Sequence, residues 1–253
     1  MLQNVVEVDG EMRAASLLAE RPGAVFFDFA AAFPSLAHDY MLDILESLQL
    51  PPQFRRFVRT SISATGARSL RLGACTRASA FELACGRVAL CPLLFALCDD
   101  LILRRLRRDV PGDMLRAYAD DLALVSREVL ASASVFAPLF ANFSAIFGLS
   151  LSLGKTVFVP LGGVPVDAFR AQLEGQSPGW SAGCIRTWAE YLGFALGLGS
   201  DERSRQKALE KFGHRADLWA QLGLGLHSTS VAYNVYVSSL LRFLLQLEVL
   251  PEA

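Results

Sequence analysis

The sequence predicts an α/β fold of the α+β kind, in which a central antiparallel sheet is backed by helices and followed by a small helical unit. Three observations support this prediction. With 253 residues, of which 53% are hydrophobic, the chain can form one large core or two modest domains. Short apolar runs at residues 24–29 and 115–125 are typical of strands. Longer segments with helical spacing of apolar residues separate these runs, which favours layers of helix on sheet.

The first two elements are a helix and a strand. Residues 1–20 have apolar side chains for one helix face. Residues 24–29 form a nearly continuous apolar run, which predicts a central strand covered on both faces. Asp28 lies inside this run. Because an ionised carboxylate buried without a partner is very unfavourable, a ligand role is the simplest explanation, and an ion pair with Arg116 or Arg87 is the alternative.

Helices dominate the middle of the chain. Ser35 is expected to cap a helix that runs to about Leu48. Within a later helix, Asp100 has Arg104 four residues on, the favourable order for an ion pair, whereas Asp99 has no such partner and its role stays open. The other elements that we predict are a helix over 52–63, a hairpin over 67–73 and 78–84, and helices over 92–108 and 130–147.

Two neighbouring acids, Asp120 and Asp121, stand between two apolar strands in the segment 115–125. Adjacent carboxylates on a half-buried hairpin cannot both stay ionised unless a cation or strong donors offset their repulsion. Oxygen donors without nearby thiolate or imidazole favour Mg²⁺ or Mn²⁺ over zinc. A solvated hairpin turn is the alternative, since Asp is an ordinary turn residue. The presence of a third acid, Asp28, on a comparable strand favours the metal interpretation.

Charge and cysteine content limit the possible classes. The net charge of -1 and the pI near 6.3 argue weakly against strong binding of a polyanion. The five cysteines have no two-residue spacing, so no zinc site is indicated, and reduced thiols of an intracellular protein are favoured. We predict no transmembrane segment. Arginines gather in three segments: residues 55, 56 and 59; residues 68, 71 and 77; and residues 104, 105, 107 and 108. Such clusters can position phosphates. The last segment is expected to be a solvated helix face instead.

Four motifs in order resemble those of reverse transcriptases. Residues 27–33 (Phe-Asp-Phe-Ala-Ala-Ala-Phe) resemble motif A, and residues 118–121 (Tyr-Ala-Asp-Asp) match motif C. Residues 148–156 look like motif D, and residues 191–194 (Tyr-Leu-Gly-Phe) look like motif E, the primer grip. The resemblance covers about residues 5–195 and is closest to the enzymes of non-LTR retrotransposons and group II introns.

The resemblance implies an RNA-directed DNA polymerase that adds deoxynucleoside triphosphates to a DNA primer on an RNA template. It implies that Asp28, Asp120 and Asp121 bind two Mg²⁺ ions, with Mn²⁺ as a substitute. Lys155 would be the general acid toward pyrophosphate, although an ordinary surface lysine is the alternative. The resemblance also implies a group of substrate contacts: Phe29, Phe33, Gly86, Arg87, Pro92 and Tyr118. It implies a primer grip made by Tyr191, Leu192 and Gly193.

The sequence departs from the family pattern in two places. The Pro-Leu-Leu-Phe half of motif B is present at residues 92–95, but Gly86 and Arg87 stand where Gln-Gly belongs. The basic finger strands expected before motif A have no counterpart. These departures favour an alternative function, a catalytically inactive, truncated descendant that serves as a nucleic-acid-binding or structural module. Phe33 is expected to be the steric gate that excludes the 2′-hydroxyl of a ribonucleotide. An ordinary core phenylalanine is an equally good interpretation of this position.

The resemblance also implies a division of the chain. Residues 1–160 would form a polymerase palm with a remnant of the fingers, and residues 161–183, rich in Gly and Pro, would form a linker. Residues 184–253 would contain motif E and a helical thumb. Two amphipathic helices are expected in the thumb, at 200–222 and 229–249, the second with an apolar stripe that is more typical of a core than of a nucleic-acid contact.

Overall fold

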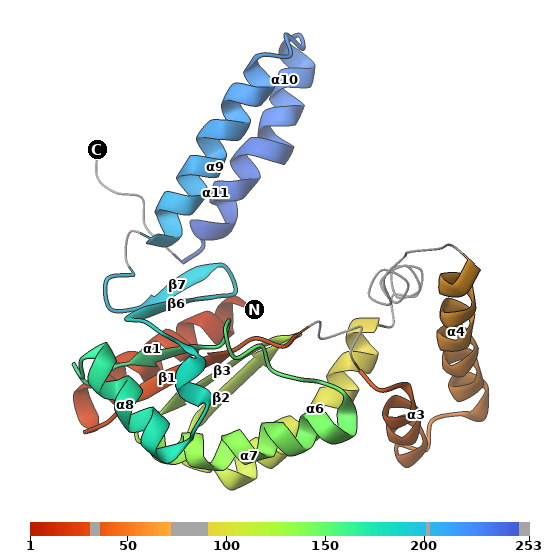
Figure 1. Ribbon diagram of the computed structural model, residues 1–253. Coiled ribbons are helices and arrows are strands. Elements are labelled where there is room, and N and C mark those ends of the chain that lie inside the picture. Colours follow the sequence, from red (N-terminus) through yellow and green to blue (C-terminus); the bar gives the residue numbers. More distant parts are fainter. Residues whose placement is uncertain (31–35, 72–90, 201–202, 248–253) are drawn as a thin grey trace.

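The computed structural model describes residues 1–30, 36–71, 91–200 and 203–247 (Figure 1). Its centre is a five-stranded sheet with strand order β2-β3-β1-β4-β5. The strands are β1 (Gly23–Phe27), β2 (Met114–Tyr118), β3 (Asp121–Ser126), β4 (Val157–Pro160) and β5 (Cys184–Ile185). Helices back this sheet, so the predicted α/β class is confirmed. The sheet is mixed rather than wholly antiparallel, because β5 pairs with β4 in parallel.

Strand β1 lies in the middle of the sheet, and all five of its residues are buried, as predicted, but it ends at Phe27, so Asp28 follows the strand instead of being buried inside it. Side chains alternate between the two faces of a strand. Val25 and Phe27 therefore join one core cluster, whereas Ala24 and Phe26 join the other. We name these the α7 face and the α1 face, after helices α7 (Val129–Phe147) and α1 (Leu2–Leu18), which contribute to the two clusters.

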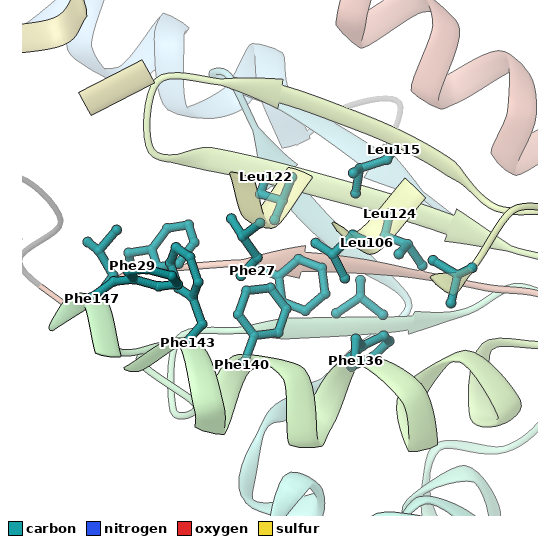
Figure 2. Packing of buried hydrophobic residues seen from close by; sticks show 14 of the residues in the cluster. Phe27, Phe29, Leu106, Leu115, Leu122, Leu124, Phe136, Phe140, Phe143 and Phe147 are labelled. Carbon is teal, nitrogen blue, oxygen red and sulfur yellow. The ribbon is translucent and has the colours of Figure 1, made fainter. Parts of the chain in front are cut away.

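Phenylalanine dominates the core on the α7 face (Figure 2). The ring centroid of Phe27 lies 5.3 Å from that of Phe136 and 4.9 Å from that of Phe140, both on α7. Helix α6 (Cys91–Asp109) contributes Leu106, which is completely buried. Aromatic pairs at these separations add to the free energy gained by burial, so this layer holds β1 firmly in place.

Helix α7 is the one helix in the described part of the chain that is long and apolar enough to cross a membrane. It has 19 residues and a mean hydropathy of 1.7 over its most apolar window, of which 39% is buried. Four of its phenylalanines pack in the core of the α7 face: Phe136, Phe140, Phe143 and Phe147. Because the core helix of a water-soluble domain has the same composition, we interpret α7 as a core helix.

A second, two-stranded sheet packs on the α1 face. Its strands, β6 (Trp188–Tyr191) and β7 (Phe194–Gly197), are antiparallel. Tyr191 packs against Phe26 of β1 with ring centroids 5.6 Å apart, and both belong to the cluster that contains Val8 of α1. The β6–β7 hairpin is therefore anchored to the central strand.

Residues 161–183 do not form the predicted linker. They contain helix α8 (Val166–Gln176) and a 3-10 turn, η1 (Trp180–Ala182). Phe169, Leu173 and Trp180 of this span are buried in the core of the α7 face. Glycine and proline bound the helix instead of preventing it. The crossover through α8 lets β5 return parallel to β4, which a short hairpin cannot do.

Helix α3 (His38–Ser47) follows β1, as predicted. Its N-cap residue is Ala37, and Ser35, the predicted cap, lies outside the described residues. Asp39 stands in the first turn of the helix, where an acid interacts favourably with the helix dipole. Met41 and Leu45 bury one face of α3.

Helix α4 (Pro52–Arg71) is longer than predicted. The predicted strand over 67–73 is wrong, since residues up to 71 are helical, and its partner at 78–84 lies outside the described residues. Alanine, arginine and leucine in this stretch favour helix, and a single glycine, Gly66, does not end one.

The last helices form an arm, residues 203–244, that projects from the β6–β7 hairpin (Figure 1). Helix α9 (Arg203–Ala220) lies beside α11 (Ser238–Leu244), and they are joined through α10 (Leu226–Ala232) and a π-helical turn, η2 (Tyr233–Val237). The first helix of the predicted pair is confirmed. The second is present as three consecutive segments.

The predicted apolar stripe of the arm is only partly core. Tyr233 and Tyr236 are 47% and 49% exposed. Tyr236 stacks on Trp219 of α9 with ring centroids 5.0 Å apart. Phe243 packs on Phe194 at the root of the arm, at 5.1 Å. Aromatic contacts thus hold the two sides of the arm together and fix its root.

Helix α6 contains the two acids singled out from the sequence. Asp100 forms the predicted ion pair with Arg104, with Nε 2.6 Å from Oδ2. Asp99 is 3% exposed, and its Oδ1 has no hydrogen-bond partner within the described ranges. Burial, reinforced by the negative charge of Asp100, raises the pKa of Asp99 to about 7. Asp99 is therefore a core acid that titrates near neutral pH.

Phe136→Ala will destabilise the fold by about 3–5 kcal/mol, because it opens a cavity among the rings around β1. Ile146→Ala on the same helix is the matched control. Ile146 is 65% exposed, so its truncation should cost less than about 0.5 kcal/mol. Urea unfolding followed by far-UV circular dichroism measures both free energies of unfolding. Equal losses in the two variants would contradict the described packing of α7.

Asp99→Asn will flatten the dependence of stability on pH. The pKa of Asp99 in the folded chain is above the ordinary value of 3.8, so its contribution to stability is complete below that value and is lost as pH rises to about 7. Between about pH 5 and about pH 8, the wild-type chain should lose about 2–3 kcal/mol more than the variant. Urea unfolding at both pH values tests this, and parallel pH profiles would refute it.

Candidate active site

The register of the central sheet brings Asp28 and Asp121 together. The β1–β3 ladder runs from Gly23 opposite Ser126 to Phe27 opposite Leu122. The next position in this register sets Asp28 across from Asp121. Neighbouring strands of a sheet lie about 5 Å apart, so two acids that are distant in sequence stand side by side at one end of the sheet.

Both carboxylates belong to the same face of the sheet. Phe26 and Ala123 are in the core cluster of the α1 face, and Phe27 and Leu122 are in the cluster of the α7 face. Side chains two residues apart on a strand lie on the same face. Asp28 therefore shares the α1 face with Phe26, and Asp121 shares it with Ala123. The helices of the α7 face therefore support the acids from behind.

Asp120 lies in the turn that joins β2 to β3. Tyr118 pairs with Asp121, so Ala119 and Asp120 form a two-residue hairpin loop. Ala119 has a φ of 52°, a left-handed conformation that is uncommon for a residue other than glycine. Both aspartates of this hairpin are exposed, and Tyr118 beside them is 46% exposed. The turn thus presents its acids to solvent from two rigid strands.

The acids at this end of the sheet influence one another. The pKa of Asp121 is raised by desolvation first and then by the negative charges of Asp120, Asp28 and Glu190. Three acidic neighbours act on one carboxylate, which is the electrostatic situation that a bound cation relieves.

Among the described residues, the cationic neighbour of Asp28 is a lysine and not an arginine. Lys155 Nζ lies 3.9 Å from Asp28 Oδ1. Arg116, one of the two alternative partners, bonds to Glu7 of α1 instead, and Arg87, the other, lies outside the described residues. The side chains of Lys155 and Asp28 are 74% and 42% exposed, so the pair is open to solvent.

Backbone contacts fix the segment before β4 against the end of β1. Ser152 N–H donates to the Asp28 carbonyl oxygen at 2.7 Å, and Asp28 N–H donates to Thr156 Oγ1 at 3.4 Å. Ala30 N–H donates to the Ser150 carbonyl oxygen at 2.8 Å. These bonds hold Lys155 beside Asp28. The segments that resemble motifs D and A therefore lie together.

The predicted primer grip forms the turn of the β6–β7 hairpin. Tyr191 is opposite Phe194, which leaves Leu192 and Gly193 as the loop, with φ values of 50° and 87°. A Cβ on Gly193 would lie 3.3 Å from the ring of Phe243. Glycine therefore suits this position both for its positive φ and for the close approach of Phe243.

Tyr191 itself is 2% exposed and belongs to the core. Its hydroxyl donates to the Arg116 carbonyl oxygen at 3.5 Å. Burial is the main cause that raises the pKa of Tyr191 to about 12, and the charge of Asp121 adds to it. Tyr191 therefore anchors the turn, and Leu192 and Gly193 are the residues at its tip.

Of the remaining predicted residues, the structure describes Phe29 and Pro92. Phe29 is 7% exposed, and its ring packs on Phe140 of the α7 face at 6.2 Å. Its side chain is therefore part of the core behind the acids. Pro92 is the second residue of helix α6. Phe33, Gly86 and Arg87 lie outside the described residues.

The donor set fits a hard divalent cation. Asp28, Asp120 and Asp121 supply only carboxylate oxygens, the ligands that Mg²⁺ and Mn²⁺ prefer. Across the described ranges, no three His, Cys, Asp or Glu side chains are gathered closely enough to enclose an ion. Like charges keep such side chains apart unless a cation draws them together. The carboxylates can therefore hold a cation, but they do not by themselves form a two-ion geometry.

Glu190 is the residue that sequence reasoning missed. It lies on β6, and its charge acts on Asp121. Both carboxylate oxygens of Glu190 accept hydrogen bonds from Lys207 Nζ of α9, at 3.1 and 2.8 Å. The one signal in the sequence was its position directly before Tyr191, which says nothing about distant neighbours.

Asp121→Asn will stabilise the fold at neutral pH in metal-free buffer. The pKa of Asp121 is raised above its ordinary value of 3.8, so the ionised form costs stability above that value. The gain should shrink as pH falls toward 4, where the wild-type carboxyl binds its proton. Urea unfolding with a chelator present at about pH 7 and about pH 4 measures the difference. A variant that is less stable at neutral pH would contradict the described crowding of acids.

Comparison with known proteins agrees with the motifs and the sheet. Residues 3–196 match the model of the family described as "Reverse transcriptase (RNA-dependent DNA polymerase)". A search of curated proteins finds no match. The matched span includes the whole central sheet, the three aspartates and the β6–β7 hairpin up to Leu196. Because the match covers well over half of the 253 residues, the chain belongs to the reverse transcriptase family.

Proposed function

We propose that the chain is an RNA-directed DNA polymerase whose active site is the acidic end of the central sheet. The observation that carries this proposal is the register that sets Asp28 across from Asp121, on the same face of the sheet, beside the Asp120 turn. Family membership makes reverse transcription the expected chemistry. A likeness to the enzymes of non-LTR retrotransposons and group II introns stays a prediction.

We assign the parts of the polymerase as follows. Residues 1–200 are the palm, because the span 161–183 packs into the same core as the sheet. The arm, residues 203–244, is the thumb. We assign the primer grip to the turn at Leu192 and Gly193, which matches motif E and lies against Phe243 at the root of the arm. An RNA template with a DNA primer would lie along the α1 face at this end of the sheet.

The three aspartates would hold two Mg²⁺ ions, or Mn²⁺ in their place. Divalent ions bound there supply activation of the primer 3′-hydroxyl and neutralisation of charge on the departing pyrophosphate. Asp28 and Asp121, which the register sets across from each other, would hold the ions together with Asp120 of the turn. Two strands and the helices behind them keep these carboxylates aligned.

Lys155 and Tyr118 complete the assignment at the edge of the site. The Lys155 ammonium is exposed and lies 3.9 Å from Asp28. We assign it the role of general acid, which would donate a proton to the leaving pyrophosphate. Tyr118, half exposed beside the turn, would contact the primer end or the incoming nucleotide. Pro92, Phe33, Gly86 and Arg87 remain predicted substrate contacts.

A second candidate function is a nucleic-acid-binding or structural module without catalysis. The replacement of Gln-Gly in motif B by Gly86 and Arg87 favours it, because that pair positions the nucleotide in the resembling enzymes. The open arrangement of the acids agrees with it as well. Binding and chemistry can be separated by experiment.

Primer extension on an RNA template with Mg²⁺ or Mn²⁺ tests catalysis. The wild-type chain should extend the primer, and Asp120→Asn should reduce extension by at least about a hundredfold, because one ligand of the ions is lost. Asp100→Asn is the matched control. Asp100 is a surface acid paired with Arg104 on α6, so its loss should leave extension unchanged.

The same preparations distinguish the second candidate. Binding of an RNA–DNA primer-template is measured by fluorescence anisotropy at several salt concentrations. Binding without extension by the wild-type chain, with either ion, would reject the polymerase and support the binding module. Equal extension by the wild-type and Asp120→Asn chains would reject the assigned site.

A further inference from the structure

Helix α7 has one face in the core and an outer face that carries no charge. Its four phenylalanines pack in the core, but only 39% of its most apolar window is buried. Residues 129–147 contain no Asp, Glu, Lys or Arg. The exposed positions of the helix are alanine, serine, valine, proline, asparagine and isoleucine. Because the outer face of a surface helix normally carries charged side chains, an uncharged one indicates a surface that a partner covers.

A groove lies between this outer face and helix α6. Its volume is about 450 Å³, a size typical of binding sites. Apolar side chains of both helices line it: Leu101 of α6, and Leu139, Phe143 and Ile146 of α7. Leu101 and Ile146 are 47% and 65% exposed. Figure 1 shows α7 at the outer edge of the molecule, with no described element beyond it. The apolar groove is therefore open to a partner.

One wall of the groove is positively charged. Arg104, Arg105 and Arg108 of α6 line it. Arg104 is paired with Asp100, whereas Arg105 and Arg108 share Asp109. Three arginines beside two aspartates leave an excess of positive charge, and the arginine side chains are between 52% and 75% exposed. Exposed ion pairs contribute little to stability, so the carboxylates of a partner can pair with these arginines as well.

The walls of the groove indicate an α-helix as the occupant. Both walls are helices, whose backbone hydrogen-bonding groups are satisfied within each helix, so the groove offers no sheet edge to an extended peptide. A segment that enters an apolar groove must satisfy its own backbone groups, as a helix does. The arginines on one wall favour a helix that carries acidic side chains beside its apolar stripe.

We propose that the groove between α6 and α7 binds an amphipathic helix of a partner protein. Its apolar side chains would pack on Leu101, Leu139 and Ile146, and its acidic side chains would pair with the arginines of α6. A second copy of this chain fits less well, since a symmetric contact would bring the same arginines together. A membrane surface fits less well, because a flat bilayer does not fill a groove.

Partner binding at the groove is independent of the proposed catalysis. The groove is built by helices that pack on the α7 face of the sheet, whereas Asp28 and Asp121 belong to the α1 face. Asp120→Asn, the variant that should abolish primer extension, should therefore bind the partner helix like the wild type. Failure at one site leaves the other site standing.

Binding of synthetic peptides to the full chain tests the proposal. The probe is a fluorescein-labelled peptide of about 18 residues, composed of leucine, alanine and glutamate, with the leucines at helical spacing. A second peptide has lysine in place of each glutamate, and a third has the first composition in scrambled order. Fluorescence anisotropy gives each Kd. The acidic peptide should bind at least about tenfold more tightly than the other two, and equal affinities would overturn the proposal.

Variants of the groove locate the binding. Ile146→Gln should weaken binding of the acidic peptide by at least about tenfold, because it removes an apolar contact at the open side of the groove. Arg104→Gln together with Arg108→Gln should weaken binding about three- to tenfold at about 0.05 M salt. This second effect should shrink at about 0.5 M salt, since exposed charges are screened.

Leu17→Gln and Arg107→Gln are the matched controls. Leu17 is 84% exposed on α1, and Arg107 lies on α6 but does not line the groove. Both variants should keep the wild-type Kd, and all variants should keep the wild-type thermal unfolding, because the substituted side chains are exposed. A loss of binding in the controls as large as that of Ile146→Gln would overturn the proposal.

Two further measurements separate the proposed partner from the other occupants. Sedimentation velocity at several concentrations reports self-association, and co-sedimentation with vesicles of phosphatidylcholine and phosphatidylserine reports membrane binding. A wild-type chain that stays monomeric, leaves the vesicles unbound and selects the acidic peptide supports the proposal. Self-association or vesicle binding that Ile146→Gln abolishes would assign the groove to a second copy or to a membrane surface, and would overturn it.

Discussion

The pairing register of β1 with β3 is the constraint on which the site depends. A slip of one residue would carry Asp121 to the α7 face, where phenylalanines would surround an unpaired carboxylate. The same slip would move Leu122 and Leu124, both buried in the core of the α7 face, to the α1 face. Burial of apolar side chains on two faces at once therefore selects the one register that leaves the acids at the solvent-facing end. The core is what aligns the carboxylates.

Repulsion among those acids has to be balanced from outside the sheet. Lys155 approaches Asp28 from the segment before β4, and Lys207 approaches Glu190 from α9. Both ammonium groups are more than half exposed, so they temper the negative potential without closing the site. An arginine held between the carboxylates would neutralise them and occupy the space that a cation needs. Arg116, close along the chain, is bonded to Glu7 instead.

The sequence predicted those parts of the fold that depend on local patterns. The apolar run around Asp28 and the hairpin at Asp120 are read within a few residues, and the structure has the central strand and the turn where expected. The span 161–183 was mistaken for a linker because glycine and proline mark breaks but not what lies between them. Its burial comes from the contact of Phe169 and Leu173 with the distant α7-face core, which no local pattern contains.

The same distinction explains why Glu190 went unnoticed while Asp28 was found. An acid within an apolar run of sequence contradicts its local surroundings, and that contradiction is visible in the sequence. Glu190 alternates with buried residues on an edge hairpin, where an exposed acid is ordinary. Its partner Lys207 and the acids whose field it shares come from distant parts of the chain. An acid whose local pattern is ordinary is recognised only from its tertiary neighbours.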